Sequence, residues 1–176
     1  IGTVKKQDIS ENLANQAYLA IGSNLGNKMN NIEITKFELE KYNIKILKSS
    51  SSYISESWPD HSMPSYINVI IKIKTNLKPL ELLIICNLIE LKLGRKRLKK
   101  NSPRTCDIDI IDYDNLVLGK KNSKLILPHP RMSERNFVLL PLFEVEKSWK
   151  HPKLKINIVN LINSLPIKDL RSIKQI

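Results

Sequence analysis

Two carboxylates that alternate along a short acidic segment are the residues best suited to chemistry in this sequence. Asp107 and Asp109 flank Ile108 and are followed by Ile110 and Ile111. In a strand, alternate residues share one face, so the two carboxylates would project together about 6–7 Å apart. Two like charges beside an apolar continuation are costly unless a cation lies between them. Oxygen ligands at this spacing suit Mg²⁺, and two such ions would form a clamp for phosphate oxygens.

The same two carboxylates have an alternative role that involves no metal. They could pair with Arg104 or with the basic residues that precede it. Along the strand, Ile111 and Tyr113 would continue the face of the two acids. Asp112 and Asp114 would lie on the opposite face at the far end, where we expect them to be solvated or to form a turn.

The chain is strongly basic, and the excess is concentrated in two stretches. Its 176 residues include 29 Lys and Arg against 17 Asp and Glu, a formal net charge of +12. Residues 92–104 hold seven bases and no acid, whereas residues 147–176 hold seven bases and one acid. The first stretch runs directly into the acidic strand, which places phosphate ligands beside metal ligands. The second carries no motif, and A+T-rich codon usage with a solvated surface would explain it.

The composition is that of an ordinary globular protein. With 41% hydrophobic and 26% charged residues, it argues against disordered, collagen-like and coiled-coil chains. The longest apolar run, residues 82–86, is far shorter than the roughly 18 residues of a membrane span. Cys86 and Cys106 lack the spacing of a zinc site and are expected to be reduced core residues. No apolar signal segment opens the sequence, so cytoplasm is the expected location.

Hydrophobic periodicity and the placing of Gly and Pro predict an α+β domain. The order β-α-β-β-α-β is that of a ferredoxin-like core, an antiparallel sheet with helices packed on it, here with C-terminal additions. This domain is expected at 17–165, after a polar lead-in or linker at 1–16 and before a basic tail at 166–176. The chain could therefore be a piece excised from a longer polypeptide.

The expected elements can be given as residue ranges. Pro79 suits a first helical turn, and Gly94 suits a helix end. The expected strands lie at 18–22, 44–54, 67–75 and 104–114. The expected helices lie after residue 27, where Ile32, Ile34, Phe37 and Leu39 supply the apolar residues, at 80–93, at 132–145 with a break or end near Pro141, and at 158–165.

The segment around the two acids carries a motif. Pro103-Arg104-Thr105-Cys106-Asp107-Ile108-Asp109 resembles the P-R-x-x-D-[LIV]-D signature of the 6-hydroxymethyl-7,8-dihydropterin pyrophosphokinase family (HPPK). Three further segments agree in order: Ala20 to Gly26, Tyr66-Ile67-Asn68, and Leu127 to Met132 with Arg135, Phe137, Pro141 and Leu142. The resemblance implies a transferase of folate biosynthesis. Such an enzyme moves pyrophosphate from ATP to the hydroxymethyl group of the pterin, releases AMP, and uses two Mg²⁺ ions.

The resemblance also implies roles for particular residues. Asp107 and Asp109 would hold both metal ions and act in catalysis together with Arg95 and Arg97 of the basic loop, which would close over the triphosphate. The residues implied to bind ATP are Asn87, Glu90, Arg97, Arg104, Ile110, His129 and Arg135. The residues implied to bind the pterin are Ser55, Ser57, Trp58, Tyr66, Asn68 and Phe137, with Tyr66 and Phe137 as an aromatic sandwich and Asn68 reading the pterin edge.

This sequence departs from the family pattern in the basic loop. The loop is one residue shorter than in well-known members, so a family Arg-Trp pair falls on Lys99, Lys100 or Asn101, and which lysine replaces the arginine stays open. The segment Gly22 to Gly26 lacks the spacing of a Walker A loop and is assigned no phosphate role. Within that segment, Asn24 could cap the first helix.

Two alternatives to an active pyrophosphokinase remain. One is a catalytically weakened module of a longer folate enzyme, for which the altered loop is the argument. The other is an RNA-binding ferredoxin-like domain, which the basic charge would suit. RNA binding would need aromatic residues exposed on adjacent central strands, yet only 6% of residues are aromatic and none lies in such a motif. Small-molecule substrates are therefore expected, with no nucleic acid and no membrane as partners.

Overall fold

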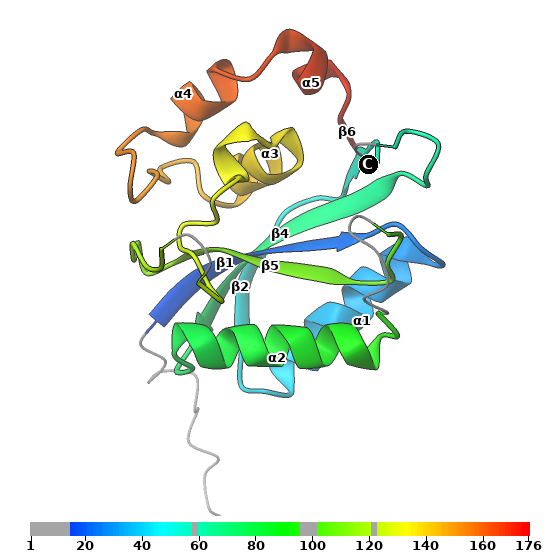
Figure 1. Ribbon diagram of the computed structural model, residues 1–176, viewed down its shortest axis with the longest axis vertical. Helices are drawn as coiled ribbons and strands as arrows, with labels where there is room; N and C mark the ends of the chain where they lie inside the picture. Colours follow the sequence, from blue (N-terminus) through cyan, green and yellow to red (C-terminus); the bar gives the residue numbers. More distant parts are fainter. Residues whose placement is uncertain (1–14, 58–59, 96–101, 121–122) are drawn as a thin grey trace, which may run out of the picture.

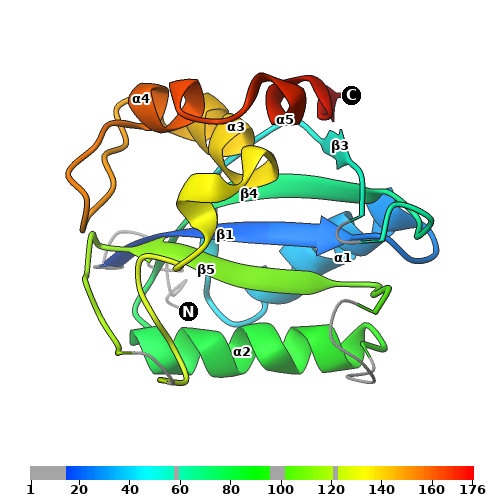
Figure 2. The same ribbon diagram turned by 45° about the horizontal axis from the view of Figure 1, so that its top comes forward.

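The computed structural model describes residues 15–57, 60–95, 102–120 and 123–176. In chain order its elements are β1 (Asn15–Ser23), α1 (Lys28–Glu40), β2 (Lys45–Ser49), β3 (Tyr53–Ser55), β4 (Tyr66–Thr75), α2 (Pro79–Lys92), β5 (Asp107–Tyr113), the 3-10 turn η2 (Met132–Glu134), α3 (Asn136–Val145), α4 (Ile158–Asn163), α5 (Ile167–Arg171) and β6 (Lys174–Gln175). One sheet lies between two layers of helices, with α1 and α2 on one face and α3, α4 and α5 over the other (Figure 1, Figure 2). Within the described ranges, no helix is long and apolar enough to span a bilayer.

The strands of the sheet run in the order β5-β1-β4-β3-β6, and β2 also pairs with β4. Every one of these pairs is antiparallel. The first and last strands of the β-α-β-β-α-β core are neighbours, and both crossover helices lie on the same face, as right-handed connections require. The predicted ferredoxin-like α+β class is therefore confirmed, and the C-terminal additions form the second helical layer.

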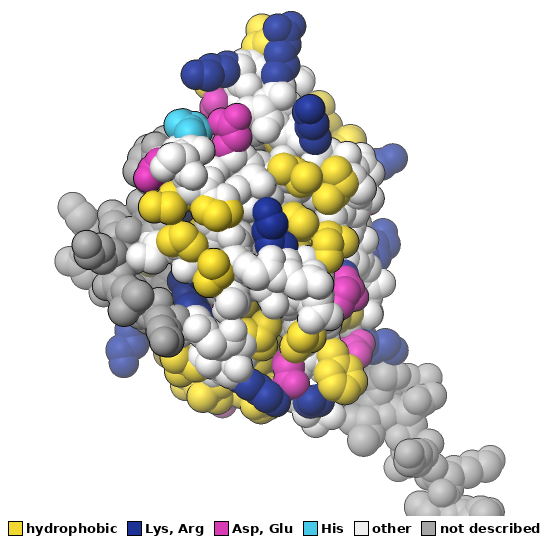
Figure 3. All heavy atoms as spheres, turned by 90° about the vertical axis from the view of Figure 1, so that its right-hand side faces the viewer, with side chains coloured by type: hydrophobic (Ala, Val, Ile, Leu, Met, Phe, Trp, Pro, Cys, Tyr) yellow, Lys and Arg dark blue, Asp and Glu magenta, His cyan; other side chains and the backbone are white. Residues whose placement is uncertain are grey.

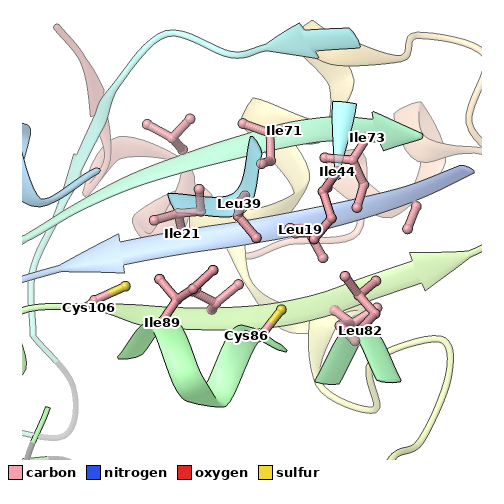
Figure 4. Close-up of a cluster of buried hydrophobic side chains, with 14 of the residues drawn as sticks. Leu19, Ile21, Leu39, Ile44, Ile71, Ile73, Leu82, Cys86, Ile89 and Cys106 are labelled. Atoms are coloured by element: carbon pink, nitrogen blue, oxygen red, sulfur yellow. The ribbon is translucent and has the colours of Figure 1, made fainter. Parts of the chain in front are cut away.

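Two apolar cores lie on opposite sides of the sheet because the central strands are apolar on both faces. The core beneath the sheet contains Leu19, Ile21, Ile71 and Ile73 of the strands, Leu39 of α1, and Leu82, Cys86 and Ile89 of α2 (Figure 4). The core above the sheet contains Tyr18, Ile70 and Ile111 of the strands, with Val138, Leu139 and Leu142 of α3. Strict alternation along β1 and β4 distributes their side chains between the two cores.

The first two helices begin and end where the sequence predicts. Pro79 occupies the first turn of α2, and Gly94 follows the C-cap residue Leu93 with a φ of +80°, a conformation that glycine adopts without strain. Asn27 caps α1 by accepting a hydrogen bond from the backbone of Asn30 at 3.1 Å. Phe37, expected among the apolar residues of this helix, is 59% exposed beneath Lys41, and its ring lies outside the core.

The strand expected at 44–54 is divided in two. β2 pairs with one part of β4 and β3 with another, so the serine run 50–52 connects them instead of continuing one strand. Ser50 still pairs with Ile70, because its backbone N–H donates to the Ile70 carbonyl at 2.8 Å and its Oγ accepts from the Ile70 N–H at 3.0 Å. Above this connection, Tyr53 donates from its hydroxyl to Glu144 of α3 at 3.0 Å.

The helix expected at 132–145 consists of η2 followed by α3, and the expected break near Pro141 is wrong. α3 continues through Pro141 to Val145. The proline removes one intrahelical hydrogen bond. Leu139 and Leu142 on either side of it are fully buried against the sheet, and this packing keeps the helix continuous.

The last core strand, β5, contains a bulge that the alternation rule misses. Tyr18 of β1 pairs with Asp112 and Leu19 pairs with Ile110, which leaves Ile111 as an extra residue. Tyr113 therefore packs in the lower core and donates its hydroxyl to the Leu77 carbonyl at 2.6 Å, instead of sharing the face of Asp107. Downstream of the bulge, the alternation of faces is shifted by one residue.

The same bulge changes the surroundings of Asp112 but not those of Asp114. Asp112 is 1% exposed, so its predicted solvation is wrong. Its carboxylate accepts from Trp149 Nε1 at 2.8 Å and from the backbone of Asn115 at 3.1 Å, the second contact being the turn that was expected. Asp114 lies in that turn with a φ of +48° and is exposed, as predicted.

The stretch 166–176, expected as a basic tail, contains regular structure. β6 pairs with β3 through Gln175 opposite Tyr53. The backbone of Ile176 donates to the Ser52 carbonyl at 2.9 Å. Both cysteines are buried and unpaired, as predicted, and burial raises the pKa of the Cys106 thiol to about 12.

Candidate active site

The end of β1 brings together the two groups of residues that the sequence predicts for substrate binding. Gly22 pairs with Asn68 of β4 on one side and with Asp107 of β5 on the other. A β-carbon on Gly22 would lie 3.3 Å from Asn68 Oδ1 and 3.6 Å from the Tyr66 ring. The predicted pterin residues and the predicted metal residues are therefore separated by one glycine.

The first of the two acids, Asp107, is paired with arginines. Arg95 Nη1 lies 2.6 Å from Asp107 Oδ1, and Arg104 Nη1 lies 3.3 Å from Asp107 Oδ2. Burial and the neighbouring Asp109 raise the pKa of Asp107, and the two arginines oppose this shift. These are the ion pairs predicted by the alternative in which the acids bind no metal. Asp107, Asp109, Arg95 and Arg104 form a compact charged group, here termed the acid cluster.

The second acid, Asp109, faces groups from the segment that leads into α3. Its Oδ2 lies 3.8 Å from His129 Nε2 and 3.7 Å from Arg135 Nη1. Burial, together with Arg135 and Arg131, lowers the pKa of His129 to about 4, so the imidazole is neutral at neutral pH. Because His129 Nδ1 accepts from the Arg131 backbone at 3.3 Å, its proton is on Nε2, toward Asp109.

Arg104 links the acid cluster to the predicted pterin residues. Its Nε donates to the Tyr66 hydroxyl at 3.0 Å, and its guanidinium carbon lies 5.7 Å from the centre of the Tyr66 ring. Phe137 has a similar neighbour, because the guanidinium carbon of Arg135 lies 5.4 Å from the centre of its ring. Both rings of the predicted sandwich are thus half-buried and each contacts an arginine.

The polar part of the predicted pterin site is rigidly held. Asn68 and Ser55 are buried, and Asn68 Nδ2 donates to Ser55 Oγ at 2.8 Å. This contact fixes the orientation of the amide, leaving Oδ1 on the side of Gly22. Ser57 is also buried and donates to the Pro64 carbonyl at 2.6 Å.

Glu90 and Ile110, two of the residues predicted to bind ATP, have buried side chains. Glu90 is 3% exposed, and its Oε1 accepts from the Ile108 backbone at 2.7 Å and pairs with Arg95. It therefore holds the start of β5 and aims Arg95 at Asp107. The Ile110 side chain is buried in the lower core, so contact with a nucleotide would come from its backbone.

The remaining predicted residues are placed as follows. Asn87 is half-buried on α2, one turn before Glu90. Trp58, Arg97 and the two lysines that could replace the family arginine, Lys99 and Lys100, lie outside the described residues. Their predicted roles stay predictions.

Sequence reasoning missed Gly22 and Asn24, although both lie in one of its four motifs. Asn24 is 2% exposed and does not cap α1, because Asn27 does. Its side chain instead contacts two loops distant in sequence, through the backbones of Pro64 and Arg104. The signal was a motif segment with no assigned chemistry, and a structural role for it could be read only from the fold.

A family model described as 7,8-dihydro-6-hydroxymethylpterin-pyrophosphokinase (HPPK) matches residues 18–147, most of the chain. The chain belongs to this family. The family resemblance predicted from four sequence motifs is thereby confirmed.

Several members of the HPPK family align over most of their own length. The 2-amino-4-hydroxy-6-hydroxymethyldihydropteridine pyrophosphokinase of Aquifex aeolicus is 37% identical over 135 residues, covering 77% of this chain and 82% of that protein. The Haemophilus influenzae protein of the same name is 36% identical over 141 residues, covering 80% and 87%. Close similarity is thus found to proteins of about this size.

Other relatives are much longer. A folic acid synthesis protein of Dictyostelium discoideum is 41% identical over 154 residues, and this chain covers 23% of it. A similar protein of Pneumocystis carinii is 34% identical over 170 residues, and this chain covers 22% of the length of that protein. Among solved structures, wild-type Plasmodium falciparum HPPK-DHPS with pterin and p-hydroxybenzoate matches with a TM-score of 0.72 at 17% identity, over 92% of this chain and 46% of that one. This last match shows the fold.

Proposed function

We propose that this chain transfers pyrophosphate from ATP to the hydroxymethyl group of 6-hydroxymethyl-7,8-dihydropterin and releases AMP. The observation that carries the proposal is the arrangement around Gly22. An acid pair with basic side chains on both sides lies on one flank, and an aromatic and amide cluster lies on the other. The first suits a triphosphate and the second a flat, hydrogen-bonding heterocycle.

The acid pair fits Mg²⁺ as a cofactor. Mg²⁺ in nucleotide enzymes is usually held by one or two carboxylates together with substrate phosphates and water, not by a cage of protein ligands. Asp107 and Asp109 supply two such carboxylates on one strand, and among the described residues no group of three or more His, Cys, Asp or Glu forms a cage. When bound, Mg²⁺ would neutralise charge on the phosphate oxygens.

The basic side chains would position the triphosphate and stabilise its charge. Arg104 and Arg135 flank the two acids and already contact them, so they stand where phosphate oxygens would approach. Arg95, held by Glu90, would exchange its contact with Asp107 for a phosphate. Neutral His129 would donate from Nε2. Phosphoryl transfer depends mainly on such positioning and charge stabilisation, which a site rich in arginine provides.

The aromatic and amide residues would bind and orient the pterin. Tyr66 and Phe137 provide faces for stacking, and Asn68 offers a donor and an acceptor to the edge of the ring. Because Ser55 fixes the Asn68 amide before substrate arrives, little side-chain entropy is lost on binding. The hydroxymethyl group would then be held toward Asp107, across Gly22.

An assay for AMP tests the proposal. The protein is mixed with ATP, Mg²⁺ and the pterin, and AMP is measured for wild type, Asp107→Ala, Asp109→Ala and Asp114→Ala. Asp114 is a matched control because it is an exposed acid just beyond the same strand. We expect AMP from wild type and the control, and loss of activity and of ATP·Mg²⁺ affinity in the other two. Absence of AMP from wild type would refute the proposal, and unchanged ATP·Mg²⁺ affinity in both variants would refute the metal site.

An RNA-binding role is disfavoured by the fold. Ferredoxin-like domains that bind RNA stack bases on an exposed sheet face, whereas helices lie over both faces of this sheet (Figure 2). On the face shown in Figure 3, Lys and Arg side chains are scattered among hydrophobic and polar ones instead of forming a continuous basic surface. Retention on single-stranded RNA at physiological salt would argue the other way.

Two wider features are also part of the proposal. A cytoplasmic location is consistent with the unpaired thiols of Cys86 and Cys106. The long folic acid synthesis relatives suggest that the chain can act as one module of a larger folate-synthesis protein. The sequence of the parent reading frame tests this second point.

A further inference from the structure

Asn24 makes an unusual set of contacts for a loop residue. Its backbone N–H donates to the Arg104 carbonyl at 3.1 Å, and its Oδ1 accepts from the Arg104 N–H at 2.8 Å. Its Nδ2 donates to the Pro64 carbonyl at 3.2 Å and lies 3.4 Å from Ser57 Oγ. With a side chain only 2% exposed, Asn24 uses its amide oxygen on one segment and its amide nitrogen on another.

Both segments that Asn24 contacts belong to the site. Pro64 and Ser57 are in the loop that leads into β4, two residues before Tyr66 at its nearest point. Arg104 leads into β5 and binds both Tyr66 and Asp107 with its guanidinium group. Asn24, the loop, Tyr66 and Arg104 therefore close a ring of covalent and hydrogen bonds around the junction of the two substrate sides.

The chemistry of this position calls for an amide. The Arg104 N–H finds its acceptor in Asn24, and the Pro64 carbonyl accepts from Asn24 as well as from Ser57, so a side chain that makes both contacts must offer an acceptor and a donor. A carboxylate offers no donor, and an apolar side chain offers neither. Because the position is buried, a group left without its partner is not rescued by water, and the two segments would lose their relative placement.

We propose that Asn24 is a positioning residue that fixes the pterin-side loop and the phosphate-side Arg104 relative to one another. The inference rests on the proposed function, because it names the two sides by their substrates. Its Oδ1 serves the phosphate side, and its Nδ2 serves the pterin side. The two sides can therefore be uncoupled by changing one atom at a time.

Three variants separate the two contacts from general stability. Asn24→Asp keeps the acceptor for the Arg104 N–H, loses the donor to Pro64 and Ser57, and places a carboxylate oxygen beside the Pro64 carbonyl. Asn24→Ala loses both. Asn27→Ala is the matched control, since Asn27 lies in the same loop and caps α1 without contacting the site. Steady-state kinetics with ATP and pterin, pterin calorimetry and thermal unfolding are measured for each protein.

We expect Asn24→Asp to raise the KM for pterin about two- to tenfold, as loss of one hydrogen bond predicts, while the KM for ATP stays within about twofold of wild type. Asn24→Ala should raise both KM values or lower kcat as well. Asn27→Ala should lower the unfolding midpoint and leave the kinetics unchanged. If Asn24→Ala does not fold, the two KM values of Asn24→Asp decide the matter.

The outcomes distinguish this inference from the proposed function. Should wild type neither release AMP nor bind the pterin, the proposed function fails and the role of Asn24 fails with it. If wild type is active and Asn24→Asp behaves like Asn27→Ala, losing stability without a change in either KM, only the positioning role is overturned. A KM increase confined to ATP in Asn24→Asp would also overturn it.

Discussion

Replacing Gly22 by alanine should weaken pterin binding while changing the stability of the protein little. The backbone φ of Gly22 is not positive, so alanine is compatible with its conformation. Such a replacement reduces the freedom of the unfolded chain, which by itself contributes about 0.4–1 kcal/mol of stability, and the tight contact with Asn68 opposes this gain. The new β-carbon would lie 3.3 Å from Asn68 Oδ1, closer than most such contacts, so the amide must shift by a few tenths of an ångström.

The shift is small but falls on the atom that would read the pterin. Asn68 is held by Ser55 at 2.8 Å, so it can yield only by lengthening that bond or by turning its oxygen away. Misplacing the two hydrogen bonds of an amide costs about 1–3 kcal/mol, which corresponds to roughly 5- to 150-fold weaker pterin binding. Pterin affinity is thus expected to fall while stability stays within about 1 kcal/mol of wild type.

Gly26 provides the matched control, because it lies in the same motif and differs in both respects. Its φ is +68°, and a β-carbon there would meet no atom within 4 Å. Gly26→Ala should therefore destabilise the fold by about 1 kcal/mol through backbone strain and leave pterin affinity unchanged. Calorimetry with pterin, in the presence of a non-hydrolysable ATP analogue, and thermal unfolding measure both quantities. If Gly22→Ala binds pterin within twofold of wild type, the reasoning about Asn68 is refuted.

Three further predictions concern the supporting structure. Asp112→Ala should cost about 1–3 kcal/mol in urea unfolding, because it leaves the buried Trp149 N–H unpaired, and unchanged stability would contradict that. Hydrogen bonds from Ser148 and Lys72 lower the pKa of Glu146 from 4.5 to about 2, so this carboxylate stabilises the fold above pH 4.5 and loses that effect as the pH falls toward 2. Glu146→Gln should flatten the pH–stability curve between these two values. Identical curves for wild type and variant in this pH range would argue against it. Deleting residues 173–176 removes the pairing of β6 with β3. The deletion should lower the unfolding midpoint by several degrees and raise the KM for pterin. An unchanged unfolding midpoint would contradict this prediction.

Local sequence rules predicted those parts of the protein that depend on neighbouring residues. Pro79 and Gly94 mark the ends of α2 because their own backbone preferences act within one turn. Asp107 and Asp109 share a face because alternation along a strand needs no partner. The order of strands and helices followed from the same periodicity, and it was enough to indicate the ferredoxin-like class.

Errors arose where a distant partner changed a local pattern. The bulge at Ile111 shifts the alternation of faces along β5, and this shift buries Asp112 against Trp149, a residue far from the strand in the sequence. Helix α3 passes through Pro141 because packing against the sheet outweighs the lost hydrogen bond. In each case tertiary contacts opposed a local preference and were stronger.

The sequence by itself determined which residues are proposed to carry the chemistry, since motif and spacing place two acids after a basic loop and indicate the aromatic and amide residues. Only the tertiary structure decided how these groups meet. It put Asn68 and Asp107 on either side of Gly22, turned Glu90 inward behind Arg95, and gave Asn24 two partners from separate loops. The reason is that side-chain identity and periodicity are properties of short segments, whereas hydrogen bonds between segments far apart in the chain exist only once the sheet has paired its strands.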